Sequence, residues 1–128
     1  MDNKDPKKIL IADNDSTVAG IYKDRLELMG FEVLLAGDGE DAVNLAKSEL
    51  PDLVLLELTL PKKSGFDVLR ELREDDTLKE TPIFIVSGDG EDGDIRKTLE
   101  MGASLFFTKS ESRLIDIIQN IEGVLLDK

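Results

Sequence analysis

The stretch PDLVLLELTLPKKSGFDVL (residues 51–69) places an apolar strand, a short loop and a helix in direct succession. Its Leu53–Leu58 segment is almost continuously aliphatic, which is typical of a parallel strand covered on both faces. The amphipathic pattern that follows predicts a helix over Gly65–Arg73. Glu57 interrupts the apolar strand near its carboxyl end. The stretch therefore predicts a strand–helix unit with one acidic side chain at the edge of the sheet.

The same alternation of short apolar runs and amphipathic segments continues through the whole chain, and it predicts a doubly wound α/β fold with a parallel sheet between two helix layers. We expect one domain over residues 1–128, with residues 1–7 as a flexible N-terminal segment. The other predicted strands are Lys8–Ala12, Phe31–Ala36, Pro82–Ser87 and Leu105–Thr108. The other predicted helices are Val18–Met29, Glu40–Glu49, Asp94–Met101 and Glu111–Leu126.

Composition excludes several classes of function. The chain has no cysteine and no histidine, so it offers no disulfide, no serine–histidine triad and no histidine metal site. Its net charge of −12 disfavours direct binding to nucleic acid or to anionic lipid. The N-terminal residues lack a signal-peptide pattern and no apolar run is long enough to cross a membrane. We therefore expect a cytoplasmic protein.

Polar side chains follow four of the predicted strands at the edge where a doubly wound sheet binds its ligands. Carboxylates suit a divalent cation, whereas a hydroxyl and an ammonium group suit the oxygens of a phosphoryl group. The set comprises Asp13, Asn14, Asp15, Glu57, Ser87 and Lys109.

These residues also have plainer interpretations. The segment from Asp13 to Ser16 has the composition of a turn and helix N-cap, and Asp15 is expected to act as the cap. Glu57 and Lys109 could form an ordinary structural salt bridge. The acidic loop GDGEDGD (Gly88–Asp94) lacks the spacing of a calcium-binding loop, so we interpret it as a solvated loop.

The motifs IADND, PDLVLLELTLP with SGF, PIFIVSG and MGASLFFTK, in this order and spacing, resemble the receiver domain of bacterial response regulators. The resemblance covers nearly the whole chain, from Lys8 to Leu126. It implies a flavodoxin-like (βα)5 fold with a five-stranded parallel sheet in the order 2-1-3-4-5. It also implies two-component signalling, in which a sensor histidine kinase transfers a phosphoryl group to an aspartate after the third strand.

The residues implied by this resemblance are only partly present. Ser87 and Lys109 match the hydroxyl and the lysine of the family, and Asp13 matches the first of its paired acids. Asn14 replaces the second acid, and Glu57 stands in place of the phosphoacceptor aspartate. The resemblance therefore implies a degenerate site without an intact phosphoacceptor, and at most a weak magnesium site on Asp13, Asn14 and Glu57.

Two replacements have direct physical consequences. The longer side chain of Glu57 extends its carboxylate towards Ser87 and Lys109, where a contact would imitate part of the phosphorylated state. Ser110 stands where the family has a proline in a cis bond, and a cis bond before a residue other than proline costs about 3–4 kcal/mol. The loop after Lys109 is therefore expected to follow a different path.

The resemblance also implies a partner-binding face on the fourth helix, the fifth strand and the last helix. Phe106 occupies the aromatic switch position of this face. The other predicted apolar residues of the face are Ile95, Leu99 and Leu105. Because Phe106 and Phe107 alternate across the sheet, one of them is expected to be buried and the other to lie near the surface.

We interpret the chain as an atypical, or pseudo-, receiver domain. It would act in cytosolic signalling as a phosphorylation-independent protein-interaction module and not as an enzyme. Its partner would be a protein, either a histidine kinase or a downstream effector. The alternative is a residually functional, magnesium-dependent acceptor of a phosphoryl group from a partner histidine kinase. A flavodoxin-like cofactor protein is disfavoured, because Asp13 and Asp15 would repel a bound phosphate.

Overall fold

The computed structural model describes residues 6–88 and 92–126. Within them lie five parallel strands in the order β2-β1-β3-β4-β5, as predicted. The strands are β1 (Lys8–Ala12), β2 (Glu32–Ala36), β3 (Leu53–Leu56), β4 (Ile83–Ser87) and β5 (Leu105–Thr108). The helices are α1 (Ser16–Leu28), α2 (Gly39–Glu49), α3 (Gly65–Glu74), α4 (Asp92–Glu100) and α5 (Leu114–Leu125).

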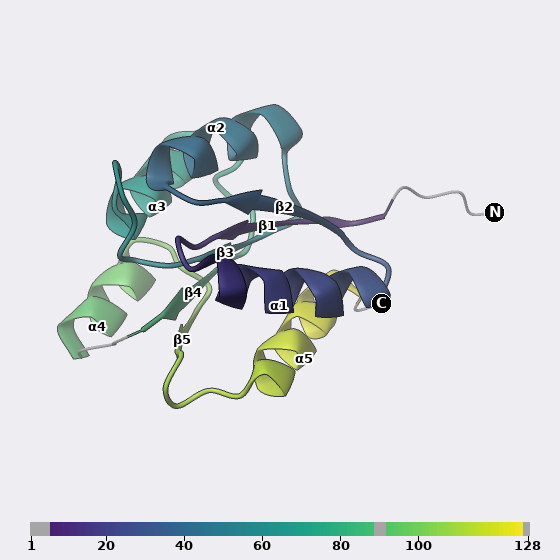
Figure 1. Cartoon of the computed structure of the whole chain (residues 1–128). Coiled ribbons are helices and arrows are strands. Elements are labelled where there is room, and N and C mark those ends of the chain that lie inside the picture. The colour runs from purple at the N-terminus through teal and green to yellow at the C-terminus, as the bar shows by residue number, and fades with distance from the viewer. Residues whose placement is uncertain (1–5, 89–91, 127–128) are drawn as a thin grey trace.

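Helices cover both faces of this sheet (Figure 1). One hydrophobic cluster joins α2 and α3 to the sheet, and a second joins α1 and α5 to its other face. The central strands β1 and β3 are buried almost throughout, which explains their continuously aliphatic sequences. The polar residues that follow these strands are therefore brought together on a rigid support.

Several predicted boundaries differ from the structure by one to three residues, and two of these differences have a visible cause. The third strand ends at Leu56 and not at Leu58, because the Leu58 carbonyl turns to accept the Gly65 N–H at the start of α3. The last helix begins at Leu114 and not at Glu111. The carbonyl of Thr108 accepts the N–H groups of Glu111 and Ser112, so the chain first completes a turn.

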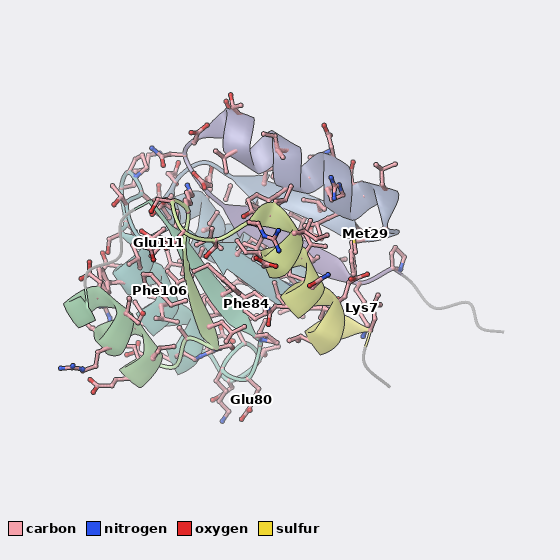
Figure 2. The ribbon with its side chains drawn as sticks, turned by 90° about the horizontal axis from the view of Figure 1, so that it is seen from below. Lys7, Met29, Glu80, Phe84, Phe106 and Glu111 are labelled. Atoms are coloured by element: carbon pink, nitrogen blue, oxygen red, sulfur yellow. The ribbon has the colours of Figure 1, made fainter. Side chains whose placement is uncertain are left out.

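The prediction for the adjacent phenylalanines is wrong in part. They do alternate across the sheet, since Phe106 packs with the α2–α3 cluster and Phe107 with the α1–α5 cluster. Both are half-buried, however, because β5 is an edge strand and its side chains are covered from one side only. Figure 2 shows Phe106 on the α4 side of the sheet and Phe84, which contacts the ring of Phe107, on the α5 side.

Some sequence predictions fall on residues that the structure leaves undescribed. Residues 1–5 of the N-terminal segment lie outside the described part, and so do residues 89–91 of the acidic loop. Among the described residues, no helix is both long enough and apolar enough to span a membrane.

Candidate functional site

The carboxyl ends of four strands gather the predicted polar residues at one edge of the sheet. Backbone hydrogen bonds from neighbouring strands fix three of them. The N–H of Asp13 donates to Ala36, that of Glu57 to Ala12, and that of Lys109 to Ser87. These hydrogen bonds anchor the three residues to the ends of the neighbouring strands.

The ammonium group of Lys109 lies between two carboxylates. Its Nζ is 2.7 Å from Oδ2 of Asp13 and 2.9 Å from Oε1 of Glu57. The acid side chains are each 7% exposed and that of Lys109 is 24% exposed, so solvent screens these ion pairs weakly. The predicted meeting of Glu57 and Lys109 is thus present in the structure, and Asp13 joins it.

The second carboxylate oxygen of Glu57 is also fully engaged. Its Oε2 accepts the hydroxyl of Ser87 at 2.8 Å, the N–H of Leu58 at 2.8 Å and the N–H of Thr59 at 3.2 Å. The two backbone donors were not apparent from the sequence, because they depend on the path of the loop after β3. Together with Lys109, they fix the position of the Glu57 carboxylate.

Asp13, Asn14 and Asp15 play three different parts. Oδ1 of Asp13 accepts the N–H of Asp15 at 2.9 Å, which orients the side chain towards Lys109. Oδ1 of Asp15 accepts the N–H groups of Thr17 and Val18, so Asp15 caps α1 as expected. Asn14 is exposed to solvent.

The electrostatics favour the charged forms of both Glu57 and Lys109. Burial alone would raise the pKa of Glu57, but hydrogen bonds from Lys109, Ser87 and Thr59 outweigh it and hold the pKa below its ordinary value. Burial likewise opposes the charge on Lys109, and the two carboxylates outweigh it and raise its pKa. The site therefore contains one fixed cation between two anions.

The receiver resemblance implies a magnesium ion bound at this site. Magnesium prefers octahedral oxygen coordination. Both carboxylate oxygens of Asp13 and both of Glu57 already accept hydrogen bonds from protein donors. In the described part of the chain, no group of three or more acidic side chains could hold a metal ion. As folded, these residues do not fit magnesium, and the predicted weak site would require Lys109 to move away.

Two neighbouring residues contribute to the site without having been predicted for it. Gly65 allows α3 to approach β3, because a Cβ atom there would overlap the Glu57 carbonyl oxygen and lie 2.6 Å from the Leu58 Cα. The SGF motif, which contains Gly65, was the feature of the sequence that could have identified this residue. Tyr22, which lies within the predicted helix Val18–Met29, lines a cavity of about 10 Å³ together with Asp13 and Glu57. Burial raises the pKa of its hydroxyl.

The predicted partner-binding face lies next to this site. Leu99 on α4 is 43% exposed, whereas Ile95, Leu105 and Phe106 are half-buried. The Lys109–Ser110 bond is trans, because the described chain contains no cis peptide bond. Hydrogen bonds through Ser87 and Lys109 connect β5 to Glu57.

Comparison with known proteins identifies the family of this chain. A family model for the response regulator receiver domain matches residues 9–121. The transcriptional regulatory protein PhoP of Bacillus subtilis is 36% identical over 103 residues, which cover 80% of this chain and 42% of PhoP. The polar-differentiation response regulator DivK of Brucella anthropi is 29% identical over 92% of this chain and 98% of DivK. The chain spans about half the length of the first four curated relatives.

Solved structures show the same fold. The Mn²⁺-bound form of the response regulator Rcp1 superposes with a TM-score of 0.83 at 27% identity, covering 96% of each chain. The BeF3-activated receiver domain of Klebsiella pneumoniae RstA superposes with a TM-score of 0.85 at 28% identity, covering 93% of this chain and 98% of that domain. By fold and by sequence, this chain belongs to the response regulator receiver domain family and is a receiver domain of two-component signalling.

Proposed function

We propose that this receiver domain is a pseudo-receiver that works as a phosphorylation-independent protein-interaction module and not as an enzyme. Its Glu57 carboxylate would replace the phosphoryl group as the anion that engages Ser87 and Lys109. It would act in the cytoplasm on a protein partner, because a net charge of −12 disfavours nucleic acid and anionic membranes.

One observation supports this proposal above the others, namely the complete engagement of the Glu57 carboxylate. Oε1 is paired with Lys109, and Oε2 accepts the Ser87 hydroxyl and two backbone N–H groups. An acceptor must instead present a free oxygen in line with the incoming phosphorus atom. Glu57 is also one methylene longer than aspartate, and such displacement of a reacting atom is costly.

We assign the partner surface to the face formed by α4, β5 and α5. The exposed Leu99 and the half-buried Leu105 and Phe106 give this face apolar side chains. Glu57 and Lys109 would hold it in one state, since Lys109 directly follows β5. The partner would be a histidine kinase or a downstream effector, because the relatives include transcriptional regulators and response regulators.

A second candidate function is residual phosphoryl transfer. It is favoured by the presence of Asp13, Ser87 and Lys109 and by similarity to structures described as Mn²⁺-bound and BeF3-activated. The chain would then accept a phosphoryl group on Glu57 from a partner histidine kinase, with magnesium held by Asp13, Asn14 and Glu57. This candidate requires the Glu57–Lys109 pair to open.

The two candidates are separated by incubating the protein with magnesium and acetyl phosphate and recording its intact mass. The native chain is expected to gain no phosphoryl group. Glu57→Asp restores the shorter carboxylate and serves as the matched variant, in which a gain would place the lost chemistry at residue 57. A phosphoryl group on the native Glu57 would refute the proposal in favour of the second candidate.

A further inference from the structure

The place of Lys109 between two acids has a consequence for metal binding. Its Nζ joins Oδ2 of Asp13 at 2.7 Å to Oε1 of Glu57 at 2.9 Å. These acids follow the adjacent strands β1 and β3, so they face each other across the carboxyl edge of the sheet. Without the ammonium group, two anions with little exposure would lie together and attract a cation.

The remaining oxygens of both acids are directed to the protein. Oδ1 of Asp13 accepts a backbone N–H from Asp15, and Oε2 of Glu57 accepts hydrogen bonds from Ser87, Leu58 and Thr59. A divalent cation could reach these carboxylates only by displacing Lys109 or by sharing with it the carboxylate oxygens that it contacts. Sharing is unfavourable, because cations repel each other strongly at short range where water is scarce.

We propose that Lys109 is the built-in cation of this site and makes its conformation independent of magnesium. The inference rests on the proposed function, and it adds that the state of the site requires no metal. Lys109 is a positioning residue here, since it neutralises and orders Asp13 and Glu57. The chain would consequently respond neither to phosphodonor nor to magnesium concentration.

Tyr22 offers a direct optical probe of the site. The chain contains one tyrosine and no tryptophan, so its intrinsic fluorescence comes from this residue. Tyr22 is buried and lines the small cavity beside Asp13 and Glu57. A cation that enters the site should change its fluorescence.

The test is a titration of the full chain with MgCl₂ at constant ionic strength, without phosphodonor. Calorimetry measures binding, Tyr22 fluorescence reports on the site, and the melting temperature reports on stability. Wild type is compared with Lys109→Met, which removes the ammonium group, and with Lys79→Met, which removes an equal charge from an exposed lysine that pairs with Asp76. Wild type and Lys79→Met should show no saturable response.

Lys109→Met should bind magnesium at least about tenfold more tightly than wild type, because it frees two adjacent carboxylates from a competing cation. Wild-type binding as tight as that of the variant would overturn the inference. A folded Lys109→Met without binding would overturn it as well. If circular dichroism shows Lys109→Met unfolded, Glu57→Asp takes its place, because its shorter side chain withdraws from Lys109. A gain of magnesium binding then supports the inference, and no gain overturns it.

The titration tests the role of Lys109 separately from the proposed function. Magnesium binding by a wild-type chain that still refuses the phosphoryl group would refute only the role of Lys109. A phosphoryl group on wild-type Glu57 would refute the proposed function, whatever the titration shows.

Discussion

Lys109 and Glu57 form an ion pair of 2.9 Å that spans three strands, because Lys109 follows β5 and Glu57 follows β3, with β4 between them. Ser87, at the end of β4, donates its hydroxyl to the same glutamate. The pair is therefore part of a network across one half of the sheet edge. Removing either partner should affect both β3 and β5.

Replacing Glu57 with glutamine should lower the free energy of unfolding by about 1.5–3 kcal/mol. The substitution preserves shape but removes the charge that pairs with Lys109, and hydrogen bonds to charged groups typically contribute this much. Urea denaturation measures the change. Glu100→Gln, on the exposed side of α4, is the control and should differ from wild type by less than about 0.5 kcal/mol. Equal stability of the two variants would contradict a net favourable pair.

Stability should depend on pH through Glu57. Its pKa in the folded protein lies below the ordinary value of 4.5, so the unfolded chain binds more protons as the pH falls. The contribution of its charged form is fully present above pH 4.5 and is lost as the pH falls through the folded pKa. Urea denaturation at a series of pH values should therefore show the advantage of wild type over Glu57→Gln shrinking below pH 4.5. An advantage that stays constant there would rule out this linkage.

Through Lys109, the stability of the protein should have the opposite dependence on pH in alkaline solution. Its pKa is raised above 10.5 by Asp13 and Glu57, against the effect of burial. The stability gained from its charge is present below pH 10.5 and is lost as the pH rises through the folded value. Lys109→Met should lack this alkaline loss relative to Lys79→Met, as measured by melting temperature. The same alkaline slope in both variants would contradict the role of Lys109.

A methyl group at position 65 should disturb the site by pressing on the backbone of Glu57 and Leu58. Gly65→Ala would place its Cβ against the Glu57 carbonyl oxygen and the Leu58 Cα, and such overpacking costs about 1–3 kcal/mol. Gly20→Ala is the matched control, because Gly20 lies within α1 and a Cβ atom there would have no packing neighbour within 4 Å. It should stabilise the protein by about 0.5–1 kcal/mol. Melting temperatures that move in the same direction would disprove the close approach of α3 to β3.

Much of the fold could be predicted because apolar periodicity alone defines strand and helix segments. Aliphatic runs such as Leu53–Leu56 show that a strand is buried, but they do not say which strands are neighbours. The order 2-1-3-4-5 therefore came from the family resemblance and not from the runs. Boundaries such as the start of α5 depended on turns closed by Thr108, which no apolar pattern encodes.

The site could be predicted as a group but not in its detail. Glu57 and Lys109 follow strands that end at the same edge, so their meeting was accessible from the sequence. The bond from Lys109 to Asp13 was not, because a flexible lysine can reach either acid and only the folded geometry shows that it reaches both. The backbone donors to Glu57 likewise depend on how the loop after β3 turns.

The Glu57–Lys109 pair is proposed to set the state of the partner-binding face, and amide NMR spectra of wild type and Glu57→Gln decide whether it does, with Glu100→Gln as the control. We predict shifts in Phe106 on β5 and in α4, beyond Lys109 and the other direct contacts of residue 57. Shifts confined to the direct contacts Leu58, Thr59, Ser87 and Lys109 would contradict this role, because the pair would then be a local salt bridge without influence on that face.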